Sequence, residues 1–338
     1  MKHTRTLLTA LLLVLSSAWS RASGDGGYLF VTFKGESPKG EQIYFALSRD
    51  GLTWSALNQS KPVLVSTIGE KGVRDPYLLR MQDGYKFVLI ATDLAIYADK
   101  IKTGSGAAAW KHSVESGSRA LVIWESTDLV NWDGPRLVSV APADAGCAWA
   151  PEAIYDPAAG DYLVFWASTT AGDHFKKHRI WAAHTRDFRE FSAPAVYIER
   201  PASIIDTTIV QDGQSYYRFS KDEVRKAILM ESSPRLDGPW REVSGFSLAT
   251  TTGIEGPECY PIKQQAGSAP QSWCLIVDFY AKSLGYQPYV AQDLGQGNFT
   301  KGEGFSFPFK FRHGAVLPIT EEECTRLEKA FSTGAARP

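Results

Sequence analysis

The chain of 338 residues has no excess of charge of either sign and no long apolar run. Its formal net charge is −1, so the composition offers no basic surface for a nucleic acid and no charged tail. The apolar run near the N-terminus, Leu7 to Leu15, is too short to cross a bilayer as a helix, and no later run is long enough. We therefore expect neither a nucleic-acid partner nor a membrane partner.

The N-terminal segment has the layout of a secretory signal peptide. Basic residues precede the short apolar run, and small residues up to Ala22 follow it at a spacing that suits cleavage. We expect a signal peptide over residues 1–22 and a mature chain from about Gly24 that is secreted or periplasmic. A retained N-terminal anchor is the alternative interpretation of the same run.

Cysteine is scarce, and its spacing does not suggest a metal site. The four cysteines include no CxxC pair and no cluster with histidine, so zinc is not indicated. An exported protein can oxidise its cysteines. Cys259 and Cys274 flank a polar turn, Gln264 to Gln271, and a disulfide across that hairpin and two free thiols are both open.

The sequence does contain repeated β-strand patterning. An alternating apolar run, a turn of Ser, Thr or Asp, and an aromatic residue recur along the chain. The recurring aromatic residues are Trp54, Trp132, Phe191, Trp240 and Phe299. Their intervals suit the four-stranded blades of a β-propeller.

A second sequence pattern completes each repeat. It consists of an opening strand, a hairpin turn such as Asp83-Gly84, and another apolar strand. Four repeats contain both patterns, and the fifth repeat is split between the chain ends. Phe311 to Ile319 would open this fifth unit, and Tyr28 to Phe33 with Ile43 to Leu47 would pair with it. We therefore predict an all-β fold in which residues 24–338 form a single five-bladed β-propeller. Its ring would be closed by N-terminal strands that pair with the C-terminal blade.

Two segments depart from the strand pattern. Tyr97 to Ser118 is expected to be a loop insertion in the first complete blade, because no strand pattern continues through it. Glu321 to Ala330 has a helical pattern and predicts a short C-terminal helix. No second domain fits in what remains of the chain.

Acidic residues open the four complete repeats, and a histidine opens the fifth. They are Asp75, Glu152, Asp206, Glu255 and His313. Since the first strand of each propeller blade lines the central axis, these side chains should converge near one channel mouth. Neighbouring carboxylates repel, so one can hold a proton near neutral pH while another stays ionised. Glycoside hydrolysis by a carboxyl pair needs that arrangement.

At these positions the chain resembles glycoside hydrolase family 43, the five-bladed propellers that include arabinanases, arabinofuranosidases and xylosidases. The motifs that carry the resemblance are, in chain order, Arg74-Asp75-Pro76, Trp149-Ala150-Pro151-Glu152, Ile205-Asp206, Glu255-Gly256-Pro257 and Arg312-His313-Gly314. Thr207 stands where the family usually has proline. The order and number of these motifs make the resemblance specific, although each motif alone is weak.

The resemblance implies an inverting glycosidase. Asp75 would deprotonate water, Glu255 would protonate the leaving oxygen, and Asp206 would keep Glu255 protonated by like-charge repulsion. The resemblance further implies that Trp149, Glu152 and His313 contact the substrate.

Each of these residues also has a structural interpretation. An Asp before Pro is often a turn or capping residue. Trp149 and Glu152 could pack the blade instead of lining a site. His313 could be a satisfied core histidine or an ion ligand. No cofactor is expected to be required, and a structural ion such as calcium in the central channel is left open.

For the substrate we expect an oligo- or polysaccharide, and the protein should act as a monomer. The insertion from Tyr97 to Ser118 would block one side of the channel and favour exo action. We therefore expect an exo-acting α-L-arabinofuranosidase on plant cell-wall side chains, with β-xylosidase or exo-β-galactosidase of the same family as alternatives. A non-catalytic carbohydrate-binding propeller would not need three differently placed acids. A fructan-cleaving propeller, suggested by Glu258-Cys259, should have an early Asn-Asp-Pro motif that this chain lacks.

Overall fold

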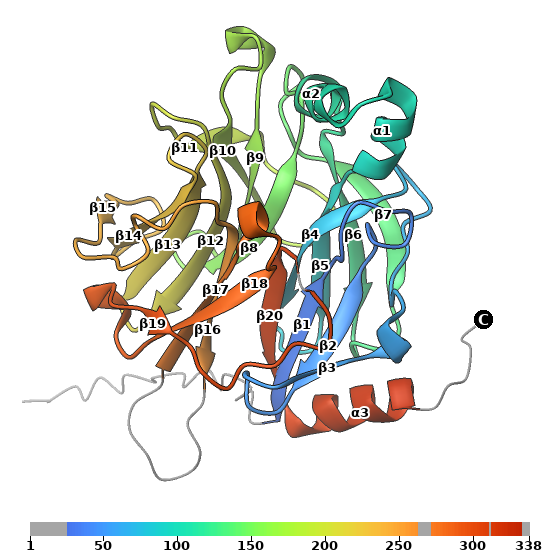
Figure 1. The fold of residues 1–338 in the computed structure, drawn as a ribbon, viewed down its shortest axis with the longest axis vertical. Coiled ribbons are helices and arrows are strands. Elements are labelled where there is room, and N and C mark those ends of the chain that lie inside the picture. The colour runs from blue at the N-terminus through green and yellow to red at the C-terminus, as the bar shows by residue number, and fades with distance from the viewer. Residues whose placement is uncertain (1–25, 263–271, 311, 333–338) are drawn as a thin grey trace, which may run out of the picture.

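The computed structural model describes residues 26–262, 272–310 and 312–332 (Figure 1). The predicted signal peptide, the turn from Gln264 to Gln271 and Phe311 lie outside the described residues.

The described residues form five antiparallel sheets of four strands, which are the blades of the predicted five-bladed β-propeller. Blade 1 contains β4 (Val73–Arg80), β5 (Phe87–Asp93), β6 (Ala120–Ser126) and β7 (Asp133–Ser139). Blade 2 contains β8 (Trp149–Asp156), β9 (Asp161–Ser168), β10 (Arg179–Thr185) and β11 (Ala195–Ile198). Blade 3 contains β12 (Ile204–Asp212), β13 (Ser215–Asp222), β14 (Ala227–Ser233) and β15 (Arg241–Glu242). Blade 4 contains β16 (Glu255–Ile262), β17 (Ser272–Asp278), β18 (Tyr286–Ala291) and β19 (Thr300–Lys301). Blade 5 contains β20 (Gly314–Ile319), β1 (Gly27–Thr32), β2 (Tyr44–Ser48) and β3 (Trp54–Ala56).

The ring closes through the chain ends, as predicted. β20 near the C-terminus pairs with β1 near the N-terminus, in a register that runs from Gly27 opposite Ile319 to Thr32 opposite Gly314. The inner strands β4, β8, β12, β16 and β20 contact one another in sequence, and β20 contacts β4 again. This closed ring places the openings of all five inner strands around one axis.

The hydrophobic core is divided among the interfaces between neighbouring blades. Side chains alternate along a strand, so in β5 Phe87 and Leu89 face blade 5 while Val88 and Ile90 face blade 2. The same alternation gives a separate apolar cluster at each of the other blade interfaces. Both faces of the middle strands are therefore apolar, which explains the continuous apolar runs in the sequence.

The repeated turn phrase has a physical basis in backbone hydrogen bonding. Asp50 Oδ1 accepts the backbone N–H groups of Leu52 and Thr53, both at 2.7 Å, in the turn between β2 and β3. Asp128 and Asp187 make the equivalent contacts in the turns after β6 and β10. An Asp side chain that captures nearby backbone donors is a standard way to fix a tight turn.

All four cysteines are buried free thiols, so a disulfide between Cys259 and Cys274 is not present. In the ladder Cys274 lies opposite Tyr260, and Cys259 lies opposite Leu275. This offset of one residue sends the two side chains to opposite faces of blade 4. Cys259 packs in the core shared with blade 3, and Cys274 packs in the core shared with blade 5.

The insertion in blade 1 is helical, which corrects the prediction of a loop. It forms α1 (Ile96–Thr103) and α2 (Gly106–Ser116) between β5 and β6. Gly104 ends α1 in a left-handed conformation, and Ser105 caps α2 by accepting the backbone N–H of Ala108 at 3.1 Å. Both helices lie at one end of the propeller (Figure 1).

The predicted C-terminal helix is present as α3 (Glu321–Ser332), at the opposite end from α1 and α2 (Figure 1). Thr320 and Glu323 form a capping box, because each side chain accepts the backbone N–H of the other. Short 3-10 helices η1 (Asn58–Ser60), η2 (Ala171–Asp173), η3 (Tyr280–Lys282) and η4 (Leu294–Gln296) occur in the connections. In the described residues, no helix is long and apolar enough to cross a membrane.

Ring closure depends on close approach at Gly314, which gives the first prediction. A Cβ at Gly314 would lie 2.0 Å from the carbonyl oxygen of Val31 in the pairing strand. Gly314→Ala should therefore destabilise the protein by about 3 kcal/mol, the upper part of the range for overpacked sites. Thermal unfolding followed by circular dichroism measures this loss. Gly172→Ala is the control, because its Cβ would have no heavy atom nearer than 4.0 Å. Equal melting temperatures for the two variants would contradict the role of Gly314.

Candidate active site

A β-bulge lies at the start of the inner strand in blades 1 to 4. In β4 the ladder pairs Arg74 with Thr92 and then Tyr77 with Ile90, so two residues oppose one. The same shift occurs in β8, β12 and β16. The first bulged residue of each strand has a left-handed backbone, with φ of 46° at Asp75, 46° at Ala150, 50° at Asp206 and 54° at Gly256. These four residues are structurally equivalent.

The bulges correct one part of the sequence interpretation, because the predicted carboxylates do not occupy matching positions. Asp75 and Asp206 are themselves the bulged residues. Glu255 immediately precedes the bulged Gly256, and Glu152 lies beyond the bulged Ala150, at the point where regular pairing resumes. The side chains are therefore distributed over two levels of the channel.

The upper level is centred on His313, which immediately precedes β20. Its Nδ1 lies 3.5 Å from Asp75 Oδ1 and 3.9 Å from Asp206 Oδ1. The structure thus brings together three of the predicted site residues from three different blades. Position 256 requires a glycine, because a Cβ there would lie 2.9 Å from the Cγ of His313.

The charges of these three groups are interdependent. Burial alone would lower the pKa of His313, but the carboxylates of Asp206 and Asp75 raise that pKa to about 9. Burial alone would raise the pKa of Asp75, but its hydrogen bond to His313 and the charge of His313 lower that pKa below its usual value. Burial raises the pKa of Asp206 to about 6 against the opposing charge of His313. At neutral pH His313 is therefore a cation between two carboxylates.

Backbone and hydroxyl donors fix the orientation of both aspartates. The Thr92 hydroxyl donates to Asp75 Oδ2 at 3.0 Å and accepts the backbone N–H of Ala150 at 2.8 Å. The backbone N–H of Gly256 donates to Asp206 Oδ2 at 3.1 Å. The bonds from Ala150 to Thr92 and from Gly256 to Asp206 cross from one blade to the next, so neighbouring blades help to orient both carboxylates.

Glu255 is the most accessible of the three acids, with a side chain that is 22% exposed. Lys221 Nζ donates to its Oε2 at 2.7 Å, and Arg312 donates to its Oε1 at 3.2 Å. Arg312 also pairs with the buried Asp278. Sequence reasoning missed Lys221 and Asp278. Lys221 is one of several charged residues at the end of β13, so its sequence context gave no signal, and it lies opposite Ile205, next to the bulge.

Aromatic rings line the channel mouth beside the insertion. Trp149 stacks on His178 with a centroid distance of 5.1 Å and meets the edge of Trp110 from α2 at 5.9 Å. The guanidinium of Arg74 lies 5.3 Å from the Trp110 ring. Burial lowers the pKa of His178 to about 4, so its imidazole packs as a neutral ring. Through Trp110, the insertion therefore contacts Arg74, the residue that precedes Asp75.

Glu152 lies deeper than predicted. Only 4% of this residue is exposed, and it belongs to the lower level together with Glu258. That Glu152 contacts substrate stays a prediction, and its burial does not favour it. Among the described residues, no group of three or more His, Cys, Asp or Glu side chains is arranged to hold a metal ion.

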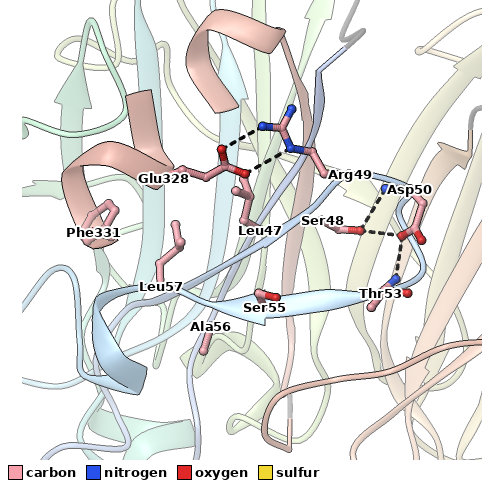
Figure 2. Close-up of a pocket in the computed structure, with 10 residues that line it drawn as sticks. All are labelled: Leu47, Ser48, Arg49, Asp50, Thr53, Ser55, Ala56, Leu57, Glu328 and Phe331. Atoms are coloured by element: carbon pink, nitrogen blue, oxygen red, sulfur yellow. Dashed lines mark hydrogen bonds and ion pairs between the residues drawn. The ribbon is translucent and has the colours of Figure 1, made fainter. Parts of the chain in front are cut away.

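A hollow of about 450 Å³ opens elsewhere, between β2, β3 and α3 (Figure 2). Leu57 and Phe331 form its apolar wall, and Arg49 bridges it by an ion pair with Glu328. β20 begins beside His313 and ends where α3 begins, so this hollow is at the far end of the ring. It is therefore separate from the converging carboxylates.

The charge cluster gives a prediction that needs no substrate. The His313 ring should titrate near pH 9, and Asp75→Asn should lower that pKa by at least about 1, because one of its two anionic neighbours is lost. Titration of the histidine ring signals by NMR measures this. Asp161→Asn is the matched control, since Asp161 pairs with His184 Nδ1 at 2.7 Å, and it should leave His313 unchanged. A His313 that titrates near its ordinary value in the unmodified protein would refute the arrangement.

Comparison with known proteins identifies the family of this chain. A model of the glycosyl hydrolase 43-related family, described as a probable glycosyl hydrolase domain, matches residues 25–325. An α-L-arabinofuranosidase of Bifidobacterium longum subsp. longum is 28% identical over 89% of this chain. The chain spans only 34% of the length of that relative.

Solved structures show the same fold at low sequence identity. An endo-1,4-β-xylanase from Bacteroides thetaiotaomicron has a TM-score of 0.54 at 15% identity, covering 86% of this chain and 93% of its own. An exo-β-1,3-galactanase from Clostridium thermocellum has a TM-score of 0.54 at 11% identity, covering 88% and 63%. The match of the family model over nearly the whole described chain confirms what the motifs indicated: this chain belongs to the glycosyl hydrolase 43-related family.

Proposed function

We propose that this protein is a secreted, inverting glycoside hydrolase that releases single α-L-arabinofuranosyl units from plant cell-wall polysaccharides. The observation that carries the proposal is the convergence of Asp75, Asp206 and Glu255 around His313 at one end of the channel. Family membership supports the reaction class, and the 28% identical arabinofuranosidase supports the sugar.

Asp75 has the properties of a general base. His313 and Arg74 help to lower its pKa, so it is ionised at neutral pH, as a base must be. The hydroxyl of Thr92 occupies one of its oxygens and fixes the plane of the carboxylate. A water molecule held by the other oxygen would be oriented for attack on an anomeric carbon.

We assign Glu255 as the general acid, because it is the most accessible of the three carboxyls. In the free protein its two oxygens accept hydrogen bonds from Lys221 and Arg312. A leaving-group oxygen must approach the same carboxyl, so substrate entry has to break at least one of these ion pairs. The charges of Asp206 and Glu255 repel each other, and this repulsion is the basis of the tuning role that we propose for Asp206.

The insertion supports exo action. α1 and α2 stand at the active-site end, and Trp110 closes against Arg74 and Trp149. A long polysaccharide could not run straight past this wall, whereas the end of a chain or a side branch could enter beside it.

Loss of either reacting carboxyl should abolish turnover. Asp75→Asn and Glu255→Gln should each fold normally and lose roughly 10²–10⁴-fold in kcat/KM. The exposed Glu303→Gln provides the matched control and should keep full activity. Near-normal turnover in either active-site variant would exclude the assignment.

The stereochemistry gives an independent check on the same pair. An inverting site leaves room for water, so the Asp75 and Glu255 carboxyl groups should be roughly 6.5–9.5 Å apart in the substrate complex. NMR of the first-formed sugar should show the opposite anomer to that of the substrate. Retention of the anomeric configuration would contradict inversion.

Asp206 should tune the reaction without carrying a proton. Asp206→Asn keeps an oxygen for the Gly256 N–H but removes the charge that favours protonation of a neighbouring acid. The alkaline limb of the pH–rate profile should move to lower pH. The loss should be smaller for substrates with good leaving groups, which need less proton donation. Identical losses on good and poor leaving groups, with an unmoved alkaline limb, would show that Asp206 only positions the sugar.

The sugar and the mode of attack can be tested together. Among aryl α-L-arabinofuranoside, β-D-xyloside and β-D-galactoside, the arabinofuranoside should react fastest, and branched polysaccharide should yield monosaccharide only.

Trp110→Ala should raise KM for oligosaccharides roughly tenfold, about 1.4 kcal/mol, with a smaller change in kcat, and Trp110→Phe should largely restore the original KM. Release of oligosaccharides by the unmodified protein would overturn exo action, and a faster xyloside or galactoside would identify the sugar instead.

A further inference from the structure

Two glutamates lie below the active site at positions that the proposed reaction does not use. Glu152 in β8 and Glu258 in β16 both lie where regular pairing resumes after the bulge, and Thr208 occupies the same position in β12. Glu152 is 4% exposed and Glu258 3% exposed. Buried carboxyls at this depth need either a cation, a set of hydrogen-bond donors, or a proton.

The available donors are too few for two ionised carboxylates. Glu258 Oε1 accepts the backbone N–H of Val316 at 2.7 Å, and its Oε2 lies 3.5 Å from the hydroxyl of Thr208. The same Thr208 hydroxyl also influences the charge of Glu152 and is the side-chain donor available to that carboxyl. A threonine hydroxyl has one hydrogen and can donate it to one carboxyl only. The other carboxyl can then share Thr208 only by donating a hydrogen of its own.

We propose that Glu152, Thr208 and Glu258 form a proton-holding floor beneath the active site, in which at least one carboxyl is neutral at physiological pH. Hydrogen bonds join β12 to β16 and β16 to Val316 of β20, and in the proposal a shared proton adds Glu152 of β8 to them. These bonds therefore link the inner strands that carry Asp206 and Glu255 to the strand that follows His313. Glu152 and Glu258 are positioning residues in this arrangement, because they act through the strands and do not touch the reacting atoms.

Groups on every neighbouring element affect the charge of this floor. Tyr77 from β4, Asp206 from β12, Tyr286 from β18 and His313 before β20 all interact electrostatically with one or both glutamates. Of these groups only His313 is cationic, and it is already held between Asp75 and Asp206. Burial, opposed by the Val316 N–H and by His313, raises the pKa of Glu258 to about 8. Burial and the charge of Glu258 raise the pKa of Glu152 well above its usual value.

The pH dependence of stability follows from the sign of these shifts. A carboxyl whose pKa is higher in the folded than in the unfolded protein stabilises the fold fully below its unfolded value of 4.5. That contribution is lost as pH rises through about 8, where Glu258 ionises without a sufficient set of donors. Replacing Glu258 with its neutral isostere Gln should remove this loss, since the amide can accept from Val316 and donate to Thr208.

The first experiment measures the melting temperature at about pH 5 and at about pH 9, and compares the fall between them in the unmodified protein and in three variants. Glu258→Gln should fold and show a smaller fall than the unmodified protein, whereas Glu258→Ala should be destabilised at both ends. Glu322→Gln, whose side chain is 85% exposed on α3, is the matched control and should show the unmodified fall. The His313 contribution is present in all four proteins and cancels in the comparison. An equal fall in Glu258→Gln and the unmodified protein would overturn the proposal.

The second experiment detects the proton directly. Infrared spectra at neutral pH should contain the carbonyl stretch of a buried protonated carboxylic acid, which disappears when both glutamates are replaced by Gln. Glu152→Gln tests the other member of the pair in the same way. If no such band is present, or if both amide variants fail to fold although they mimic the protonated side chains, the carboxyls are ionised and the proposal is wrong. Neither readout depends on the substrate or on the proposed reaction.

Discussion

The bulge at the start of four of the five inner strands is the constraint on which the site depends. A regular antiparallel ladder would alternate successive side chains between the two faces of the blade. Two residues opposite one break this alternation and turn the first of them toward the axis, at the cost of a left-handed backbone that few residues tolerate. Aspartate and glycine tolerate it best, and three of the four bulged positions are Asp75, Asp206 and Gly256. The placement of these side chains is thus determined by backbone geometry that blades 1 to 4 repeat.

Closure of the ring brings the bulges of separate blades together at one site. Two of the contacts around the aspartates cross between blades, Ala150 to Thr92 and Gly256 to Asp206. His313 comes from the blade built from both chain ends, so its position between Asp75 and Asp206 requires that β20 pairs with β1. Destabilising that pairing would therefore affect the electrostatics of the site before the core of any single blade is lost.

The sequence was sufficient for the architecture and for placing Asp75 and Asp206 beside His313, because both follow from repeats. Strand periodicity, the Asp-containing turns and the split fifth unit all predicted the ring correctly. The sequence did not reveal the offset among the carboxylates, since the left-handed backbone at Ala150 has no local signal. It also did not reveal Lys221 and Asp278, which reach Glu255 and Arg312 from second strands and are adjacent only after pairing. The helices of the insertion were missed although Gly104 and Ser105 are ordinary cap residues.

A narrow channel with five acidic side chains poses one electrostatic problem, which the structure addresses in three ways. Asp75 and Asp206 share the cation of His313 and accept oriented hydrogen bonds. Glu255, the most accessible of these acids, is neutralised by Lys221 and Arg312. Glu152 and Glu258, which are almost fully buried, have too few donors for two charges, and in our proposal they keep a proton. The three arrangements follow the burial of the acids: two cations pair with the most accessible one, a shared cation lies between Asp75 and Asp206, and a neutral carboxyl suits the deepest position. Exchanging any two of these environments would leave a buried charge unpaired or a reacting acid locked, so the depth of each acid in the channel decides what it can do.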